Sequence, residues 1–421
     1  MKMKSFLIVL LAVLSLSVAA QKRAMTPEDL WKLGRVSDVQ LSPNGKTILY
    51  GVTKYDLQAN SGNRDLFTIP VKGGAPELIT SFNGSEYNGV WRPDGKKIAF
   101  ISAKNGSPQI WESSVDGKLK RIISDEKEGI VGFSYSPDGD KILMVKAVKL
   151  ERTPQEIYSD MPENTAMIFD DLMYRHWDSW HDYKYNHIFV ADYKDGEISN
   201  VKDIMPSEHY DSPGNPWGGM EQISWSNDGK YIAYTCKKLK GKDYALSTNT
   251  DIYLYNVETG STRNISAPNK GYDQDPVFSP DNEKIVWRSM KTPGFEADKD
   301  RIFVYDMASR QITDYSEGFD QSSSHFVWGK KSDELFFISG YHATYQVYKL
   351  DLETKEISAI TEGRHNYQEI CYGGKFLVGT KMAMDMPTEV FKIDAKKGKE
   401  TQITETNKYI LKDIEMGKVE E

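Results

Sequence analysis

Cysteine is scarce in this sequence, and so are long apolar runs. The only cysteines among the 421 residues are Cys236 and Cys371, which lie in separate copies of a repeat. The sequence leaves a disulfide between them open, although two small buried side chains in strands are the favoured interpretation. Beyond the first twenty residues no apolar stretch reaches the length of a membrane-spanning helix. The fold must therefore be stabilised by a large apolar core rather than by disulfides.

Clusters of positive charge and phosphate-binding loops are also missing. The chain has 53 Lys and Arg against 61 Asp and Glu, and its net charge is −8. Without a basic cluster the protein has nothing with which to neutralise a phosphate backbone, so nucleic acid is excluded as a partner. Because glycine-rich phosphate loops are absent, no cofactor is predicted.

Motifs of hydrolytic catalysis are absent too. A nucleophilic serine of the α/β-hydrolase type needs a Gly-x-Ser-x-Gly turn, and the sequence contains none. The seven histidines scatter through hairpins and loops, so no catalytic residue is predicted. His176 and His181 occur near Asp178 and Asp182, but this spacing matches no common zinc pattern, and no metal site is predicted.

Residues 1–20 have the features of a secretory signal peptide. Lys2 and Lys4 supply the positive start, Phe6 to Leu16 form the apolar stretch, and small residues stand at the expected cleavage point. No cysteine lies there, so no lipid anchor is predicted. We expect a mature chain that begins at Gln21 and is exported to the periplasm or the outside of a bacterium. A buried core helix is the alternative.

A short unit recurs along the rest of the chain. It consists of an apolar strand, a polar turn that often contains Pro and Asp/Asn-Gly, and a second apolar strand. The copies of the turn are Leu41–Lys46, Trp91–Lys96, Tyr135–Gly139, Trp225–Gly229, Phe278–Asn282, Trp328–Ser332 and Cys371–Lys375. A second hairpin follows each copy and often ends in an Ile-Thr or Ile-Ser pair. Two hairpins in each unit predict a four-stranded sheet.

The spacing of these turns predicts the architecture. Successive turns lie about one propeller blade apart, except for a longer interval between Gly139 and Gly229. We therefore predict an all-β fold, a seven-bladed β-propeller of four-stranded antiparallel blades over residues 21–410, with an insertion at residues 149–187. A β-sandwich is the structural rival, but it does not predict seven near-regular copies.

The insertion is rich in aromatic and acidic residues. Its segment Ile168 to Trp180 is predicted to form a short helix with Trp177 and Trp180 on one face. Two interpretations stay open. The insertion either packs against the propeller as a structural element or projects near the central channel and holds a peptide.

Several strings in the sequence resemble the prolyl oligopeptidase family of serine peptidases, and most closely its dipeptidyl peptidase 5 and acylaminoacyl-peptidase-like members. The resemblance covers the chain from about Met25 to its C-terminus. The turn repeat is shared with many periplasmic propellers, whereas the longer strings are more specific. These strings are Arg175–Trp180 with His187–Val190, Tyr234–Lys238 with Ser247–Tyr253, Gly271–Asp281, and Trp287–Lys291 with Gly294–Arg301.

The resemblance implies a propeller that gates a buried peptidase site, followed by an α/β-hydrolase domain that carries Ser, Asp and His. Residues 411–421 would begin the linker to that domain, which is missing here, so no catalytic residue carries over. The resemblance also implies acidic and aromatic groups for the amino end of a peptide. A carboxylate would pair with its ammonium group. Glu221 is the candidate carboxylate, and Trp177, Trp180 and Trp217 are candidate pocket residues; a solvated Glu and structural Trp side chains are the alternative.

Two functions follow from these features. The chain is expected to be the propeller of an exported dipeptidyl or acylaminoacyl peptidase, inactive by itself, with peptides as its ligands. The alternative is a stand-alone periplasmic propeller that binds a protein partner. Whether the protein forms a homodimer stays open.

Overall fold

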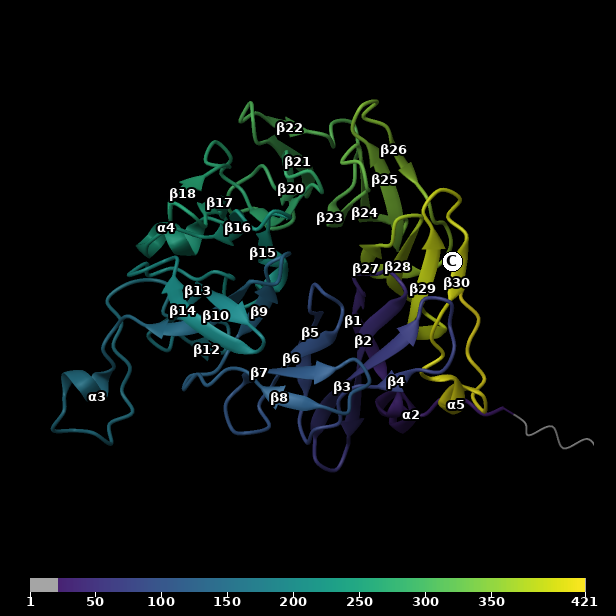
Figure 1. Ribbon diagram of the computed structural model, residues 1–421, viewed down its shortest axis with the longest axis horizontal. Coiled ribbons are helices and arrows are strands. Elements are labelled where there is room, and N and C mark those ends of the chain that lie inside the picture. The colour runs from purple at the N-terminus through teal and green to yellow at the C-terminus, as the bar shows by residue number, and fades with distance from the viewer. Residues whose placement is uncertain (1–21, 421) are drawn as a thin grey trace, which may run out of the picture.

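A ring of β-sheets surrounds a central opening in the computed structural model, which describes residues 22–420 (Figure 1). The predicted signal peptide, residues 1–20, lies outside the described residues. The predicted all-β class is confirmed, because the described helices are few and short. Between residues 22 and 420, no helix has the length and apolar character needed to cross a bilayer.

Five sheets contain four antiparallel strands each. In chain order their strands are β1 (Arg35–Leu41), β2 (Thr47–Asp56), β3 (Ser61–Pro70) and β4 (Glu77–Leu78); β5 (Glu86–Trp91), β6 (Lys97–Ser102), β7 (Gln109–Ser114) and β8 (Lys120–Ile122); β9 (Gly132–Tyr135), β10 (Lys141–Lys149), β13 (Lys184–Lys194) and β14 (Glu197–Asp203); β15 (Ile223–Trp225), β16 (Tyr231–Cys236), β17 (Asp251–Asn256) and β18 (Thr262–Asn264); and β19 (Asp273–Phe278), β20 (Lys284–Ser289), β21 (Arg301–Asp306) and β22 (Ile312–Asp314).

The last eight strands are assigned to one sheet because a single parallel pair, Tyr345 with Asn366, joins its two halves. The strands are β23 (Ser323–Trp328), β24 (Glu334–Tyr341), β25 (Thr344–Asp351), β26 (Ile357–Ala359), β27 (Asn366–Tyr372), β28 (Phe376–Ala383), β29 (Met386–Asp394) and β30 (Glu400–Gln402). Figure 1 shows the first strand nearest the central opening in the groups where that strand is labelled, namely β1, β5, β9, β15, β23 and β27, and β19 is the corresponding first strand of the fifth sheet.

The remaining elements are short and lie outside these sheets. They are the helices α2 (Pro27–Lys32), α3 (Pro154–Ile157), α4 (Gly241–Leu246) and α5 (Lys408–Leu411), the 3₁₀ helix η1 (Met220–Gln222), and the hairpin of β11 (Arg175–His176) and β12 (Ser179–Trp180).

The repeated turn joins the first two strands of each group, and its side chains fix its shape. In the third copy, the hydroxyl of Ser136 donates to Asp138 Oδ1 at 2.5 Å and accepts from the backbone N–H of Lys141 at 2.9 Å. Gly139 then takes a φ of 77°, a left-handed conformation that glycine adopts without strain. Asn282 takes the same position with a φ of 63°, because asparagine tolerates this region better than most residues.

The Ile-Thr and Ile-Ser pairs of the sequence also have a structural role. After the fourth strand, the Ser or Thr hydroxyl accepts a hydrogen bond from a backbone N–H of the third strand. Such bonds occur at Thr80, Ser124, Ser266, Ser316, Thr361 and Thr404. Five of these residues follow an Ile, and Ser316 follows Tyr315. All six residues are buried. Because an unpaired buried N–H is costly, these hydroxyls help to hold the outermost strands in place.

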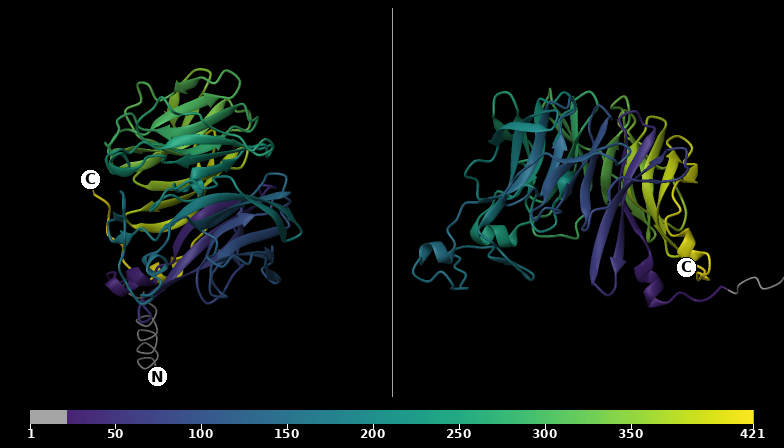
Figure 2. Two further views of the ribbon diagram at one scale, coloured as in Figure 1. Left: turned by 90° about the vertical axis from the view of Figure 1, so that its left-hand side faces the viewer. Right: turned by 60° about the horizontal axis from the view of Figure 1, so that its bottom comes forward.

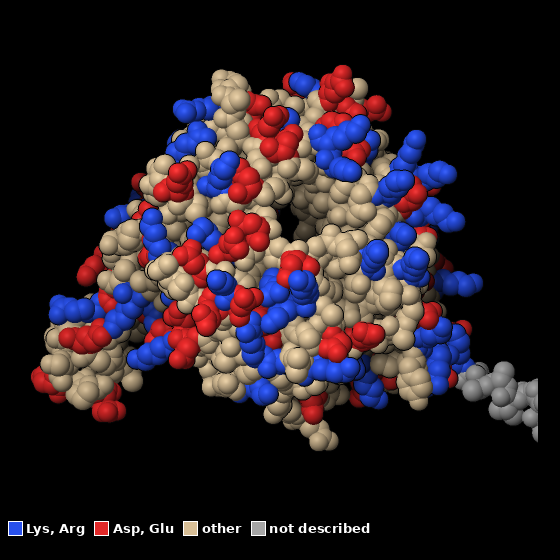
Figure 3. All heavy atoms as spheres, in the orientation of Figure 1, with Lys and Arg blue, Asp and Glu red and all other residues tan. Residues whose placement is uncertain are grey.

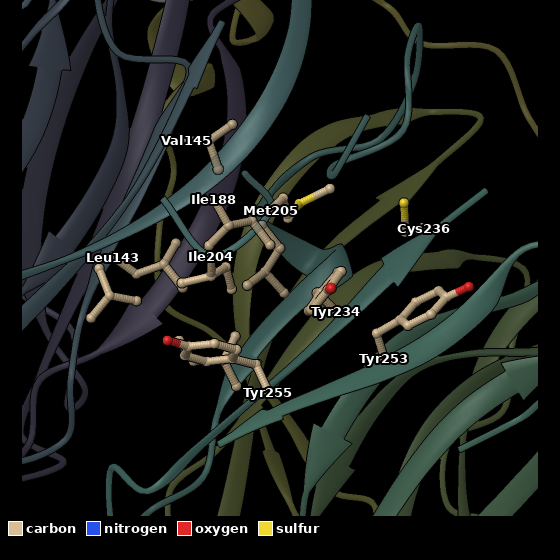
Figure 4. Packing of buried hydrophobic residues seen from close by; sticks show 12 residues of the cluster. Leu143, Val145, Ile188, Ile204, Met205, Tyr234, Cys236, Tyr253 and Tyr255 are labelled. Carbon is tan, nitrogen blue, oxygen red and sulfur yellow. The ribbon is translucent and has the colours of Figure 1, made fainter. Parts of the chain in front are cut away.

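The apolar core lies between neighbouring sheets. In Figure 4, Leu143, Val145 and Ile188 of the third sheet face Tyr234 and Tyr253 of the fourth. Cys236 lies in the same cluster, and both cysteines are free thiols. Similar clusters connect all the remaining pairs of neighbouring four-stranded groups around the ring.

The two ends of the described chain meet at a seam between the first and the last strands. Val36 and Val52 share a core cluster with Val378 and Val390. Beside this cluster, the amide of Asn407 accepts from Gly34 N–H at 2.8 Å and donates to Gly34 C=O at 2.9 Å. Within residues 22–420, neither the β1–β4 sheet nor the β27–β30 group contains a strand from the opposite end. The seam is therefore closed by side-chain packing and hydrogen bonds, without an exchanged strand.

The insertion joins β10 to β13, and its predicted helix is wrong. Where Ile168 to Trp180 was expected to be helical, the chain forms the β11–β12 hairpin, with Trp177 at a φ of 50° in its turn. Stacked aromatic rings stabilise the hairpin in place of the helix. The ring of Phe169 lies 6.0 Å from that of Trp180 and 5.4 Å from that of Tyr183, with nearly parallel planes. A short isolated helix is marginal by itself, so this aromatic packing decides the local structure.

A buried carboxyl at the start of β5 makes stability depend on pH. Glu86 is fully buried, Ser102 donates to its Oε1 at 3.4 Å, and its Oε2 has no hydrogen-bond partner among the described residues. Burial raises the pKa of Glu86 from 4.5 to about 7, and its hydrogen bonds offset this only in part. The folded state thus favours the protonated form. The stabilisation that comes from this raised pKa is complete below the pKa that Glu86 has in the unfolded chain. It is lost as the pH rises through about 7.

We therefore expect Glu86→Gln to be more stable than the parent protein at pH 8, by about 1–2 kcal/mol. At pH 4.5 the two proteins should differ little, because Glu86 is then protonated in the folded parent. Urea unfolding at both pH values measures the difference. Glu77→Gln, at an exposed residue of β4, is the control. A Glu86→Gln variant that is equally destabilised at both pH values would contradict the prediction.

Candidate functional site

The loops at one end of the ring carry the exposed aromatic side chains. In an antiparallel four-stranded group, the connections between the second and third strands and between successive groups lie at the same end. Every exposed aromatic residue within residues 22–420 belongs to such a connection, to a strand end beside it, or to a chain end. They are Trp31, Tyr55, Tyr158, Tyr174, Trp177, Trp180, Trp217, Phe295, Tyr341, Tyr345 and Tyr409.

This end of the ring is called the loop face below. The helices α2, α3, α4 and α5 and both ends of the described chain also lie on it (Figure 2). The opposite end carries the Ser-Pro-Asp-Gly-type turns, whose residues are small and polar. A concentration of exposed aromatic residues is typical of a surface that contacts a partner or a ligand. The loop face is therefore the candidate functional surface.

Glu221 lies in η1, directly before the inner strand β15. Its Oε1 accepts from the backbone N–H of Gly219 at 2.7 Å, and its side chain is exposed. Asp275 and His325 are close enough for the Glu221 charge to influence the pKa of each. Both residues belong to inner strands, β19 and β23, so Glu221 lies near the wall of the central opening. Figure 3 shows that opening with side chains of both charges around it.

Asp275 and His325 occupy equivalent β-bulges. Their φ values are 59° and 53°, and the strand register shifts at both places. Bulges re-aim side chains, and the same register shift occurs in the inner strands β1, β5 and β27, so it is a repeated feature of this fold. Arg288 Nε lies 2.7 Å from Asp275 Oδ2. Burial nevertheless raises the pKa of Asp275 to about 6, and burial together with Arg288 lowers the pKa of His325.

The chemistry available at this wall is the binding of a polar or charged group. Glu221 is free of ion pairs within residues 22–420, and an ammonium group is a suitable partner for its carboxylate. In the same part of the chain, no histidine ring hydrogen-bonds to a Ser, Thr or Cys side chain, and no three metal-ligating side chains cluster.

The structure separates the predicted tryptophans into two places. Trp177, at the tip of the β11–β12 turn, lies 5.4 Å from the ring of Trp217, in the loop that leads to Glu221. These two side chains are 71% and 73% exposed, so their contact bridges the insertion and the Glu221 loop on the surface. Trp180 instead belongs to the aromatic stack of the insertion, with Arg175 lying 5.4 Å from its ring.

Two adjoining cavities lie beneath the insertion, with volumes of about 400 and 270 Å³. Trp180 lines the larger one, Glu151 and Tyr185 line the smaller, and Asp211 and His181 line both. Sequence reasoning missed Asp211, Asp275 and the cavities. Asp275 lies within the string Gly271–Asp281, but the string does not point to a site role, and the cavity residues come together only when distant loops pack.

Comparisons with known proteins agree with this architecture. The family model described as the TolB beta propeller domain matches residues 32–163 and 222–409. The unmatched stretch between them holds Trp177, Trp180, Trp217 and Glu221, so the match does not bear on these residues.

Curated relatives and solved structures are longer than this chain in most cases. Dipeptidyl-peptidase 5 of Porphyromonas gingivalis is 39% identical over 387 residues, which is 92% of this chain and 56% of that protein. The Pyrococcus horikoshii acylaminoacyl peptidase shares the fold with a TM-score of 0.68 at 19% identity, over 92% of this chain and 55% of that one. The β-propeller domain of the Trilobed protease from Pyrococcus furiosus matches with a TM-score of 0.60 at 18% identity, over 89% of this chain and 97% of that one. The chain thus spans little more than half the length of the peptidases it resembles.

Proposed function

Because this chain belongs to the TolB beta propeller domain family, we propose that it is the substrate-gating propeller of an exported serine peptidase that acts on peptide amino termini. The observation that carries the proposal is the gathering of all exposed aromatic residues on the loop face, among the described residues. Both chain ends also lie on that face. A hydrolase domain would cover it and enclose the mouth of the central opening. The similarity to a dipeptidyl-peptidase of greater length supports this assignment.

The propeller would consist of seven blades. This count treats the eight-stranded sheet as two four-stranded blades, since only one parallel residue pair joins the halves. The core clusters support it, because each one lies between two successive four-stranded groups and one of them spans the seam. Residues 411–421 would lead toward the hydrolase domain, and the signal peptide of residues 1–20 would direct the protein to the periplasm or outside the cell.

Within this function, Glu221 would bind the ammonium group of the substrate, with Trp177 and Trp217 beside it. We expect Glu221→Gln to lower kcat/KM for free-amine dipeptide substrates about tenfold, because a charge-assisted pair is replaced by a neutral one. The measurement uses a chimera in which residues 22–421 replace the propeller of the P. gingivalis enzyme, assayed on dipeptidyl-naphthylamides. Glu258→Gln, in the exposed turn between β17 and β18, is the matched control.

Different outcomes would contradict different parts of the proposal. An unchanged kcat/KM for Glu221→Gln would remove the role of Glu221 alone. Hydrolysis by residues 22–421 without a hydrolase domain would contradict the expected inactivity of the propeller. A chimera that folds but is inactive, while residues 22–421 bind a periplasmic protein, would favour the alternative of a stand-alone binding propeller.

A further inference from the structure

The two cavities beneath the insertion share part of their walls. Met173, His181, Asp211 and Tyr244 line both, so the cavities adjoin along these side chains. The floor comes from strands and loops of the third and fourth sheets, and the roof comes from the insertion. A hollow of this size between a loop insertion and its support is large enough for an amino acid side chain or a small ligand.

Asp211 is a fixed carboxylate without a cationic partner. Its Oδ1 accepts from the backbone N–H of Asn186 and from Asn215 Nδ2, both at 2.8 Å. Within residues 22–420, Asp211 takes part in no ion pair with Lys or Arg. Burial raises its pKa to about 6, and the hydrogen bond from Asn186 opposes this rise. Asp211 is half-buried, and a carboxylate that is held in place in such a cavity without an ion pair favours the entry of a cation.

The cations that line these cavities already contact other groups. Arg175 lies over the ring of Trp180, Lys184 Nζ is 2.7 Å from Glu128 Oε2, and Lys240 lies 6.0 Å from the ring of Tyr210. Lys237 covers Tyr244 at 4.3 Å, although it does not line either cavity. In the smaller cavity Asp170 and Asp171 add further negative charge.

Aromatic rings and one unused donor complete the walls. Tyr185 contacts His181 with ring centroids 4.8 Å apart, and its hydroxyl donates to Glu151 at 2.7 Å. His181 Nδ1 accepts from Tyr183 N–H, so the neutral ring carries its proton on Nε2. That Nε2 is buried and has no hydrogen-bond partner among the described residues. A ligand that carries an acceptor oxygen near its cation would use it.

We propose that the two cavities form one binding site for an organic cation, an ammonium or guanidinium group that pairs with Asp211 against the rings of Tyr185 and Tyr244. Carboxylate and aromatic face together recognise such a cation. It can come from the amino terminus of a peptide or from a Lys or Arg side chain. Because binding here needs no hydrolase domain, an inactive chimera would leave this inference standing.

Isothermal titration of residues 22–421 at pH 7.5 tests the site with three probes. Norleucine amide carries an α-ammonium group, Nα-acetyl-lysine amide a side-chain ammonium group, and Nα-acetyl-norleucine amide no charge. We expect at least one cationic probe to bind and the neutral probe not to bind. Whichever cationic probe binds identifies the source of the cation.

Asp211→Asn is expected to weaken that binding about tenfold, since it keeps an oxygen for Asn186 but removes the charge. Asp195→Asn, in the exposed turn between β13 and β14, is the matched control and should bind like the parent. Tyr244→Leu removes an aromatic ring that lines the site but leaves the carboxylate of Asp211. Its weakened binding is the test if Asp211→Asn unfolds at a lower temperature than the parent. Equal binding of the neutral probe, no binding of either cation, or unchanged binding in a folded Asp211→Asn would overturn the proposal.

Discussion

Replacing Glu112 by alanine is expected to lower the free energy of unfolding by about 3–5 kcal/mol, because it removes the shared acceptor of a buried network. Glu112 is 1% exposed. Tyr135 donates to its Oε1 at 2.9 Å, and Tyr193 donates to the same oxygen. Arg121 Nη2 and Lys97 Nζ lie 2.7 and 3.1 Å from Oε2.

The charges of this network explain the size of the effect. Burial would raise the pKa of Glu112, but hydrogen bonds from Tyr193, Arg121, Lys97 and Tyr135 outweigh it and lower the pKa. The carboxylate is therefore ionised in the folded protein. Its loss leaves two buried tyrosine hydroxyls and two partly exposed cations without their acceptor. Glu112 also joins the second sheet, which holds β7, to the third, which holds Tyr135 and Tyr193.

Urea unfolding of the parent and of Glu112→Ala measures this prediction. Glu112→Gln should fall between the two proteins, because it keeps an acceptor oxygen but loses the charge. Glu258→Ala, at an exposed turn, should remain within about 0.5 kcal/mol of the parent. If Glu112→Ala unfolds at the same urea concentration as Glu258→Ala, the network contributes nothing to stability.

Asn407→Ala is expected to cost about 2–3 kcal/mol and to loosen the seam. The change leaves the buried N–H and C=O of Gly34 without partners, and each unpaired backbone group costs about 1–2 kcal/mol. A side chain at position 34 cannot fill the space that Asn407→Ala leaves, since a Cβ at Gly34 would lie 2.9 Å from Val52 Cγ1.

Hydrogen exchange distinguishes this effect from general destabilisation. In Asn407→Ala, amides of β1 and β29 should lose protection, whereas amides of β16 and β20, on other sheets of the ring, should keep theirs. Asn105→Ala, in the exposed turn between β6 and β7, is the control and should change neither. Uniform loss of protection around the ring would contradict a local role for Asn407.

The repeat in the sequence predicted the strands well, because its turns depend on local chemistry. Ser136 and Asp138 form their hydrogen bonds within five residues, so the sequence alone contains the information. The Ile168 to Trp180 segment was predicted as a helix from the spacing of Trp177 and Trp180. Its structure depends instead on the stacking of Phe169, at the start of the segment, with Trp180 and with Tyr183, which lies beyond its end.

The candidate site could be predicted only in part for the same reason. Glu221 was a candidate because it stands next to an inner strand, and it stays a prediction; Asp275 and His325, which lie near it, come from two other sheets. The contact of Trp177 with Trp217 was not foreseen as a pair, although both were candidates. No sequence motif marks Asp211 as a cavity residue, since the cavity that it lines is built from segments on both sides of the insertion, with Ala147 before it and Tyr244 after it.

The seam at Gly34 and Asn407 has a consequence for how the chain is made. As far as residues 22–420 show, each four-stranded group is complete once its own residues have left the ribosome, because none of these groups contains a strand from the far end of the chain. Contacts within a group have low sequence separation and form early, whereas the Gly34–Asn407 contact joins residues 373 positions apart. We expect synthesis to build a growing arc of finished sheets, and only its final turn to bring the first and last sheets together.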